Sequence, residues 1–287
     1  MNVRPFALSD LEGAARFAQA ARERDRFVEP FGERLSSLAN GERARLSVWR
    51  VLDGDDGKVR GIAFAAARDS ATLDVYAAVD PLLRRQGFGR ALLGAALGLP
   101  VKLRARVAEE ATAGRAFLSA VGFAHRTSQL SLQLARVTRS QRAVSSATVS
   151  GPPPPAIAVR PARREDEPAL RRLSNEAWAG APDVFAAQPE DEVFADDRTV
   201  WLAERGGHPV GYLAGRKLDR AIAIEELAVL PSARRLGVGS ALVRQALDGR
   251  DGALLSVAED NLAARALYER LGFTASLRRL VYEREPL

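Results

Sequence analysis

The decapeptide RRLGVGSALV (234–243) repeats, with few changes, the earlier stretch RRQGFGRALL (84–93). When the chain is overlaid on itself at this spacing, residues 76–123 align with residues 226–273 without a gap. Self-similarity of this extent indicates a repeated structural unit. The sequence therefore predicts two copies of one domain, each large enough to hold its own hydrophobic core.

A segment of different composition separates the copies. Residues 136–155 are polar and Ser-rich and end in four consecutive prolines, which favour an extended, semi-rigid spacer. A proline-motif ligand is the alternative interpretation. A chain of 287 residues suits two domains. We therefore expect an N-terminal domain over 1–135, a linker over 136–156 and a C-terminal domain over 157–287.

Hydrophobic spacing in the second copy alternates between the periods of strands and helices. The expected elements, in chain order, are IAVRPA, REDEPALRRLSNEAWAG, TVWLAER with HPVGYLAGR, AIAIEELAVL, GVGSALVRQAL, GALLSVAE, NLAARALYERLG and FTASLRRLVYER. Pro231 ends one strand, and Asn261 is a typical helix N-cap. The first copy has the same order, so each copy should be a mixed α/β domain.

Composition excludes several kinds of site. The chain has no cysteine, and its two histidines, His125 and His208, lie in different copies. Disulfides, thiolate metal sites and cysteine nucleophiles are thereby excluded, and we expect no metal site. No apolar run reaches the about 18–20 residues of a membrane helix, and the N-terminus lacks a signal-peptide core. These features predict a cytosolic protein.

The net charge of +6 is unevenly distributed. Residues 1–150 carry 23 basic and 15 acidic side chains, whereas residues 151–287 carry 19 and 21. A positive half can attract nucleotides or nucleic acid, but an ordinary charged surface is the simpler explanation. The sequence has no basic patch with interleaved aromatics, which is typical of single-strand binding. Nucleic-acid binding is therefore a weak alternative.

The repeated decapeptide combines features that suit a diphosphate ligand. Gly237 and Gly239 allow a tight turn and a close approach of a ligand to the backbone. The helix that follows begins with N–H groups that lack intrahelical acceptors, and this end carries partial positive charge. Arg234 and Arg235 add charges that can pair with phosphate oxygens. Taken alone, the same residues also suit a plain strand-to-helix turn.

The order strand, Pro, R-x-x-G-x-G, helix, strand and N-x-x-A-x-x-x-Y-x-x-x-G-F resembles the GNAT acetyltransferase superfamily. The matching residues are LAVLPSARRLGVGSAL (227–242) and NLAARALYERLGF (261–273). The resemblance covers nearly the whole chain outside the linker. It implies two tandem GNAT-like domains of α/β (mixed α+β) class, each a mostly antiparallel central sheet flanked by helices. The motif stands too late in the domain for a Rossmann loop.

From this resemblance, the co-substrate is acetyl-CoA. Its pyrophosphate would lie on the backbone amides from Leu236 to Ser240, through Gly237, Val238 and Gly239. Backbone groups around Ala228 and Val229 would hold the pantetheine and the thioester, where the strand leaves its neighbour at a bulge. A backbone N–H there would polarise the thioester carbonyl. Asn261 resembles the Asn of the family that contacts CoA, a role compatible with N-capping.

Acetyl transfer to an amine needs a base for the amine proton and an acid for the leaving thiol. From the resemblance, Tyr268 is the acid, with a packing aromatic as the alternative. The family often places a carboxylate on the strand before the motif, so Glu226 is the first choice for the base and Glu225 the second. Alternation sends these two to opposite faces. A structural carboxylate or a water chain stays the alternative, and Ser256 stands where one N-terminal acetyltransferase subfamily has a Glu.

The first copy keeps the diphosphate motif but not the proton-handling residues. It retains Arg84, Gly87 and Gly89. The positions that match Asn261, Tyr268 and Glu226 hold Ala111, Leu118 and Tyr76. We hypothesise that the second copy catalyses, and that the first binds CoA unproductively or acts as a scaffold. A divergent active first site using Asp74 and Tyr76 is the alternative.

The resemblance implies an acetyl-CoA-dependent N-acetyltransferase that acts on a primary amine of a small molecule or peptide. A tandem layout with a degraded first copy resembles the mycothiol synthases, which act on a cysteinyl pseudodisaccharide, although the sequence displays no determinants of that substrate. The alternative function is a non-catalytic CoA-binding regulator or scaffold. The oligomeric state, including a homo-oligomer, is left open.

Two further features bear on the acceptor. The acidic residues of segment 177–197 either attract a cationic amine or form a solvated helix face. Trp178, Trp201 and Tyr212 either line a pocket or pack in the core.

Overall fold

The computed structural model describes residues 1–25, 46–68, 71–135, 156–179, 194 and 197–286. These residues form two compact units. Unit 1 comprises Met1–Ser128 with Arg278–Leu287, and unit 2 comprises Gln129–Leu277. Of the predicted linker 136–156, residues 136–155 lie outside the described residues.

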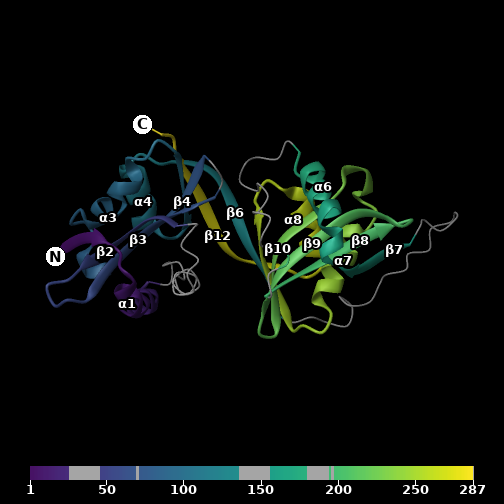
Figure 1. Ribbon diagram of the computed structural model, residues 1–287, viewed down its shortest axis with the longest axis horizontal. Helices are drawn as coiled ribbons and strands as arrows, with labels where there is room; N and C mark the ends of the chain where they lie inside the picture. The colour runs from purple at the N-terminus through teal and green to yellow at the C-terminus, as the bar shows by residue number, and fades with distance from the viewer. Residues whose placement is uncertain (26–45, 69–70, 136–155, 180–193, 195–196, 287) are drawn as a thin grey trace. The chain divides into compact units, whose positions relative to one another are not determined.

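Unit 1 is a sheet with helices on both faces (Figure 1). Its elements are β1 (Asn2–Pro5), α1 (Leu11–Arg24), β2 (Leu46–Asp53), β3 (Val59–Ala67), β4 (Thr72–Val79), α3 (Phe88–Leu97), β5 (Lys102–Ala108) and α4 (Thr112–Ala120). The strands pair in the order β1-β2-β3-β4-β5, and only β4 and β5 run parallel. Helix α1 packs on one face, while α3 and α4 pack on the other.

Unit 2 repeats this arrangement. Its elements are β7 (Ile157–Pro161), α6 (Glu167–Ala177), β8 (Arg198–Arg205), β9 (His208–Leu218), β10 (Ala221–Val229), α7 (Val238–Leu247), β11 (Gly252–Ala258) and α8 (Leu262–Arg270). The pairing order is β7-β8-β9-β10-β11, again with one parallel pair, β10 and β11. Helix α6 covers one face, and α7 and α8 cover the other. The predicted fold class is confirmed.

The two sequence copies exchange their last strands. Strand β6 (Ala124–Leu134) follows the first copy in the sequence, yet its residues 129–134 pair with β11 of unit 2. Strand β12 (Thr274–Arg284) ends the second copy, yet its residues 279–284 pair with β5 of unit 1. The compact units therefore differ from the contiguous domains expected over 1–135 and 157–287, because each sheet is completed by residues from the other copy.

Apolar residues of the exchanged strands belong to the cores that they enter. Leu132 and Leu134 are buried in the core of unit 2, among residues of α7 and β11. Leu280 and Tyr282 are buried in the core of unit 1. The alternation of buried and exposed residues that fits a strand to a half-buried sheet therefore does not reveal which sheet it joins.

The parallel strand pairs separate before they end, and in unit 2 the strand β10 also has a bulge. Strand β10 pairs with β11 over Ala221–Ile224 only, and β4 pairs with β5 over 72–74 only. The register of β10 against β9 shifts between Ile224 and Glu226, which leaves Glu225 as an extra residue. The register of β4 against β3 runs without a shift. A β-bulge re-aims the side chains beside it.

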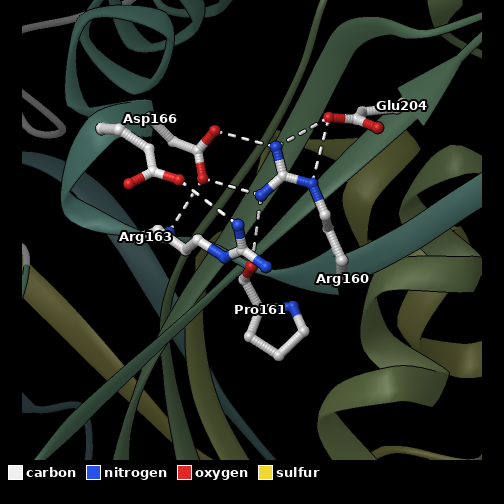
Figure 2. Close-up of polar contacts among 6 residues, drawn as sticks. Arg160, Pro161, Arg163, Asp166 and Glu204 are labelled. Carbon is white, nitrogen blue, oxygen red and sulfur yellow. Dashed lines mark hydrogen bonds and ion pairs between the residues drawn. The ribbon is translucent and has the colours of Figure 1, made fainter.

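A partly buried ionic corner occurs in both units, where the stretches VRPFALSD (3–10) and VRPARRED (159–166) resemble each other. Figure 2 shows the Arg160 guanidinium between the carboxylates of Asp166 and Glu204, at 2.7 and 2.8 Å. Asp166 also accepts a hydrogen bond from the backbone N–H of Arg163. In unit 1, Arg4 binds Asp10 and Asp53 in the same way, at 2.7 and 2.6 Å. The corner joins the first strand of each unit to its first helix.

Candidate active site

The turn before α7 presents free backbone N–H groups. Gly237 adopts a left-handed conformation with φ of 86°, and Arg235 has φ of 64°. The first hydrogen bond of the helix runs from Ala241 N–H to the Gly237 carbonyl. In the described part of the chain, the N–H groups of Val238, Gly239 and Ser240 have no backbone acceptor. Such a concave set of N–H groups at a helix N-terminus suits an anion.

The two positions of the motif require glycine for different reasons. Gly237 provides the positive φ, which other residues adopt only with strain. Gly239 lies against α8, and a Cβ atom there would come within 3.1 Å of the Leu267 side chain. The second glycine therefore allows the helix that follows the turn to pack closely on α8, which carries Tyr268.

The two arginines of the motif also differ. The Arg234 guanidinium donates to the carbonyls of Val229 and Ala177, at 3.2 and 3.1 Å. Arg235 is exposed, and its side chain has no partner among the described residues. Both were expected to meet phosphate, but the guanidinium of Arg234 is directed at the protein backbone. Arg235 is exposed beside the turn as a charge without a partner among the described residues, and contact of either arginine with phosphate stays a prediction.

The gap between β10 and β11 receives backbone groups of Val229 but not of Ala228. The N–H of Leu230 donates to Val210 on β9, and successive residues of a strand direct their backbone groups to alternate sides. A Cβ atom on Gly211 of β9 would lie 2.7 Å from the Ala228 carbonyl, which confirms that Ala228 faces β9. The N–H of Val229 therefore points toward β11, into the gap.

Glu226 is a shielded carboxylate beside this gap. Its side chain is 18% exposed, and its Oε2 accepts a hydrogen bond of 3.1 Å from the Tyr212 hydroxyl. Burial raises the pKa of Glu226, while the charge of Arg198 and the hydrogen bond from Tyr212 oppose that rise. A carboxyl group with a raised pKa is, when ionised, a stronger base than an ordinary carboxylate.

Glu225, the second choice for the base, is held by two arginines. Its carboxylate lies 3.0 Å from Arg198 and 3.2 Å from Arg216. Arg198 also approaches Glu226, at 3.8 Å. Both carboxylates thus reach one guanidinium, so the expected placement on opposite faces is wrong. The reason is the bulge, because the extra residue breaks the alternation at Glu225.

Tyr268 lies on α8 in the core of unit 2, on the sheet face opposite to Glu226. Its ring centroid is 5.5 Å from that of Phe273, and its side chain packs among apolar residues. Its hydroxyl has no hydrogen-bond partner among the described residues. Burial raises the pKa of Tyr268 above its usual range, so the hydroxyl keeps its proton at neutral pH.

Asn261 caps α8. Its Oδ1 accepts a hydrogen bond of 3.1 Å from the Ala264 N–H, and its side chain is exposed. The N-cap interpretation of Asn261 is confirmed, and a contact with CoA stays a prediction. The matching residue in unit 1, Ala111, has nearly the same backbone angles but no capping side chain.

Two groups beside Glu226 were not identified as parts of the site from the sequence. Tyr212 was considered for a pocket or for the core; it packs in the core on the α6 face, and its hydroxyl donates to Glu226. Arg198, whose side chain is 2% exposed, starts the strand β8. A charged residue at the start of an apolar strand was the available signal. Trp201 packs in the core beneath the Arg250 guanidinium.

Unit 1 keeps the turn but fills the place of the base with aromatic rings. Gly87 and Arg85 have φ of 86° and 65°, and a Cβ on Gly89 would contact Phe117 at 3.1 Å. Tyr76 stands where unit 2 has Glu226, and its ring stacks on Phe64 at 4.6 Å. The described residues of unit 1 therefore place no carboxylate at this point of the strand.

The acidic segment expected near the acceptor lies mostly outside the described residues. Of its acids, Asp197 is described, and it pairs with Arg216 at 2.7 Å.

Each helix in the described ranges is too short or too polar to cross a membrane.

Comparison with known proteins decides the family. Residues 167–273 match the model of the Acetyltransferase (GNAT) family. A mycothiol acetyltransferase of Clavibacter michiganensis is 30% identical over 86% of this chain and 82% of its own length. The chain belongs to the GNAT acetyltransferase family. It is a tandem GNAT N-acetyltransferase, and family membership supports acetyl-CoA as the acetyl donor.

Other relatives and solved structures cover nearly the whole of this GNAT protein. A mycothiol acetyltransferase of Thermomonospora curvata is 30% identical over 94% of this chain and 92% of its own. A GCN5-related N-acetyltransferase of Sphaerobacter thermophilus has a TM-score of 0.75 at 20% identity, over 99% and 95% of the chains. A tandem GNAT protein from the clavulanic acid biosynthesis pathway has a TM-score of 0.73 at 19% identity, over 99% and 98%. These structures support the fold.

Proposed function

We propose that this acetyltransferase moves the acetyl group of acetyl-CoA to the primary amine of a mycothiol-related acceptor, and that unit 2 catalyses the transfer. The observation that carries the proposal is the shielded carboxylate of Glu226 beside the gap between β10 and β11. The names of the relatives favour the acceptor class. A location in the cytoplasm stays a prediction.

The residues of unit 2 supply each part of the reaction. The N–H groups of Val238, Gly239 and Ser240 receive the pyrophosphate, and the Val229 N–H stabilises negative charge on the thioester oxygen. Glu226 accepts the proton of the attacking amine as the C–N bond forms. Tyr268 gives its proton to the sulfur as the C–S bond breaks, and solvent returns the proton afterwards.

A matched pair of variants tests the base. We expect Glu226→Gln to lower kcat by about 10²–10⁴-fold, whereas Glu225→Gln should change it far less, because Glu225 is already paired with Arg198 and Arg216. The assay follows release of CoA from acetyl-CoA with cysteinyl aminosugars, amino acids, polyamines, aminoglycosides and peptide N-termini. Turnover with only another class of amine would refute the proposal of a mycothiol-related acceptor. Equal losses in both variants would refute the choice of Glu226.

The pH dependence of the reaction tests the same residue. The pKa of Glu226 is raised by burial, and the residue acts as a base only when ionised. We therefore expect kcat/KM to rise with pH through a pKa above the ordinary range of a carboxyl group, and this limb to vanish in Glu226→Gln. A limb that persists unchanged in the variant would assign the base elsewhere, for example to water.

The first copy raises a second candidate function, the binding of CoA without turnover. The left-handed Gly87 and the free N–H groups of Phe88 and Gly89 favour it, since they repeat the turn of unit 2. We expect two CoA molecules per chain in calorimetry, and one after Gly87→Val, which strains the turn. A stoichiometry of one in the parent protein would refute occupancy of unit 1.

A further inference from the structure

The first arginine of the repeated motif makes the same kind of contact in both units. In unit 2, Arg234 joins the carbonyl of Val229, which ends β10, to the carbonyl of Ala177, which ends α6. In unit 1, Arg84 joins the carbonyl of Val79 at 3.3 Å to the carboxylate of Asp25 at 2.7 Å, and Asp25 is the C-cap of α1. Each arginine thus ties the end of a first helix to the end of a strand.

The end of α6 has a second attachment, which leads to Glu226. Leu173 of α6 packs with Tyr212 in one core cluster. The side chains of Ser174 and Trp178 lower the pKa of the Tyr212 hydroxyl, against the larger effect of burial. That hydroxyl donates to Glu226. Ser174 and Tyr212 are both buried. The last turn of α6 therefore contacts the candidate base through Tyr212 and the strand beside the gap through Arg234.

We propose that Arg234 is a positioning residue: it holds the last turn of α6, and through it Tyr212 and Glu226, in register with the strand that receives the thioester. The proposal rests on the proposed function of unit 2. Its geometry is a fork, since Nε and one terminal nitrogen of a single guanidinium meet two carbonyls. An ammonium group cannot reproduce a planar fork.

The competing role, a charge that pairs with phosphate, makes opposite predictions. A phosphate contact depends on charge, so Arg234→Lys would retain it, and its loss would weaken binding of CoA in a salt-dependent way. A fork between two carbonyls depends on geometry, so Arg234→Lys and Arg234→Gln should both lose it. Arg235, exposed beside the same turn, provides the matched control for a phosphate contact.

The test uses the full chain and three variants, Arg234→Lys, Arg234→Gln and Arg235→Gln. Calorimetry with CoA at low and high salt measures binding, and hydrogen exchange measures the stability of the last turn of α6. For both Arg234 variants we expect the Kd for CoA to stay within about twofold of the parent and exchange over 174–178 to accelerate about tenfold, because about one hydrogen bond is lost. For Arg235→Gln we expect the reverse pattern.

Kinetics with the accepted amine add a second readout. Both Arg234 variants should lower kcat about 10- to 100-fold through misplacement of the base, with little change in the KM for acetyl-CoA. The proposal is overturned if Arg234→Gln weakens CoA binding and Arg234→Lys restores it, or if exchange in α6 is unchanged. If the parent acetylates no amine on the panel, the acceptor proposal fails, while binding and exchange still decide the role of Arg234.

Discussion

The two units share the residues that build the domain and differ at the positions that we propose handle protons in unit 2. Both have the ionic corner, the left-handed glycine, the strained residue before it and the arginine that ties helix to strand. Along the strands that face α1 or α6, unit 1 has the row Trp49, Phe64 and Tyr76, and unit 2 has Val200, Ala214 and Glu226.

The difference in that row has a physical cause. In unit 1, the rings of Trp49 and Phe64 stack at 4.3 Å, and the Tyr76 hydroxyl accepts a hydrogen bond of 2.7 Å from Arg106. The volume beside the strand is thereby filled. In unit 2, the matching places hold the small side chain of Ala214 and, beside the bulge at Glu225, the carboxylate of Glu226. Unit 1 therefore keeps the glycine turn, but it has an aromatic ring at the position of Glu226.

Substitution of the proposed acid, Tyr268, should have the largest effect on turnover, compared with substitution of the matching residue of unit 1. We expect Tyr268→Phe to lower kcat by about 10²–10⁴-fold, because the leaving thiolate loses its proton donor. Leu118, at the same place in unit 1, is an apolar core residue, so Leu118→Met should leave turnover close to that of the parent. Comparison of kcat at saturating acetyl-CoA checks both variants. A Tyr268→Phe variant with the kcat of the parent would refute the role of Tyr268 as the acid.

Because the last strands are exchanged, a substitution in the last strand of one sequence copy should destabilise the unit built mainly from the other copy. Leu132→Ala lies in the sequence of the first copy but should destabilise unit 2 by about 2–4 kcal/mol, because it leaves a cavity in that core. Leu280→Ala should do the same to unit 1. Denaturant unfolding with proteolytic mapping measures which unit opens first. Opening of unit 1 in Leu132→Ala would contradict the strand exchange.

The ionic corners should give a smaller, pH-dependent effect. Hydrogen bonds from Arg160 and from backbone lower the pKa of Asp166 to about 2. Since this value lies below the unfolded value of about 3.9, the contribution is complete above pH of about 4 and is lost as the pH falls toward about 2.

Asp166→Asn should therefore destabilise unit 2 by about 1–2 kcal/mol at neutral pH and much less at low pH. Asp10→Asn is the matched variant in unit 1, where Arg4 lowers the pKa of Asp10. Thermal unfolding at several pH values measures both. A destabilisation that does not change with pH would mean that lost packing, and not lost charge, is the cause.

The helix caps should give the smallest effect and can be exchanged in both directions. Asn261→Ala should cost about 0.5–2 kcal/mol, and Ala111→Asn should stabilise α4 by up to about 1 kcal/mol, because the backbone at both positions already has the capping conformation. Urea unfolding measures both changes. No gain from Ala111→Asn would show that the N-terminus of α4 cannot accept the added side chain.

Local features of the fold and the site could be predicted from the sequence. The duplicated turn, the helix that starts at Gly237, the cap at Asn261 and the order of the elements follow from glycine conformation, capping and hydrophobic period, which act within a few residues. The bulge was expected only from the family resemblance, since AIAIEELAVL by itself reads as one regular strand. It decides how Glu225 and Glu226 are placed.

Long-range features could not be predicted. The strands that contain Leu132 and Leu280 have similar alternation, and nothing in either assigns it to one sheet. The contacts of Arg234 with Ala177 and of Tyr212 with Glu226 join residues 57 and 14 positions apart. Their side chains could be assigned roles only after the fold had placed them.

The crossed strands also bear on the evolution of the gene. A recombination breakpoint in segment 136–155 would divide the coding sequence into two fragments, and each product would lack the strand that completes its β-structure. Descendants that retain only one fragment would start from an incomplete protein. Selection for acetylation would therefore preserve both halves of the gene, even where one of them carries out no chemistry.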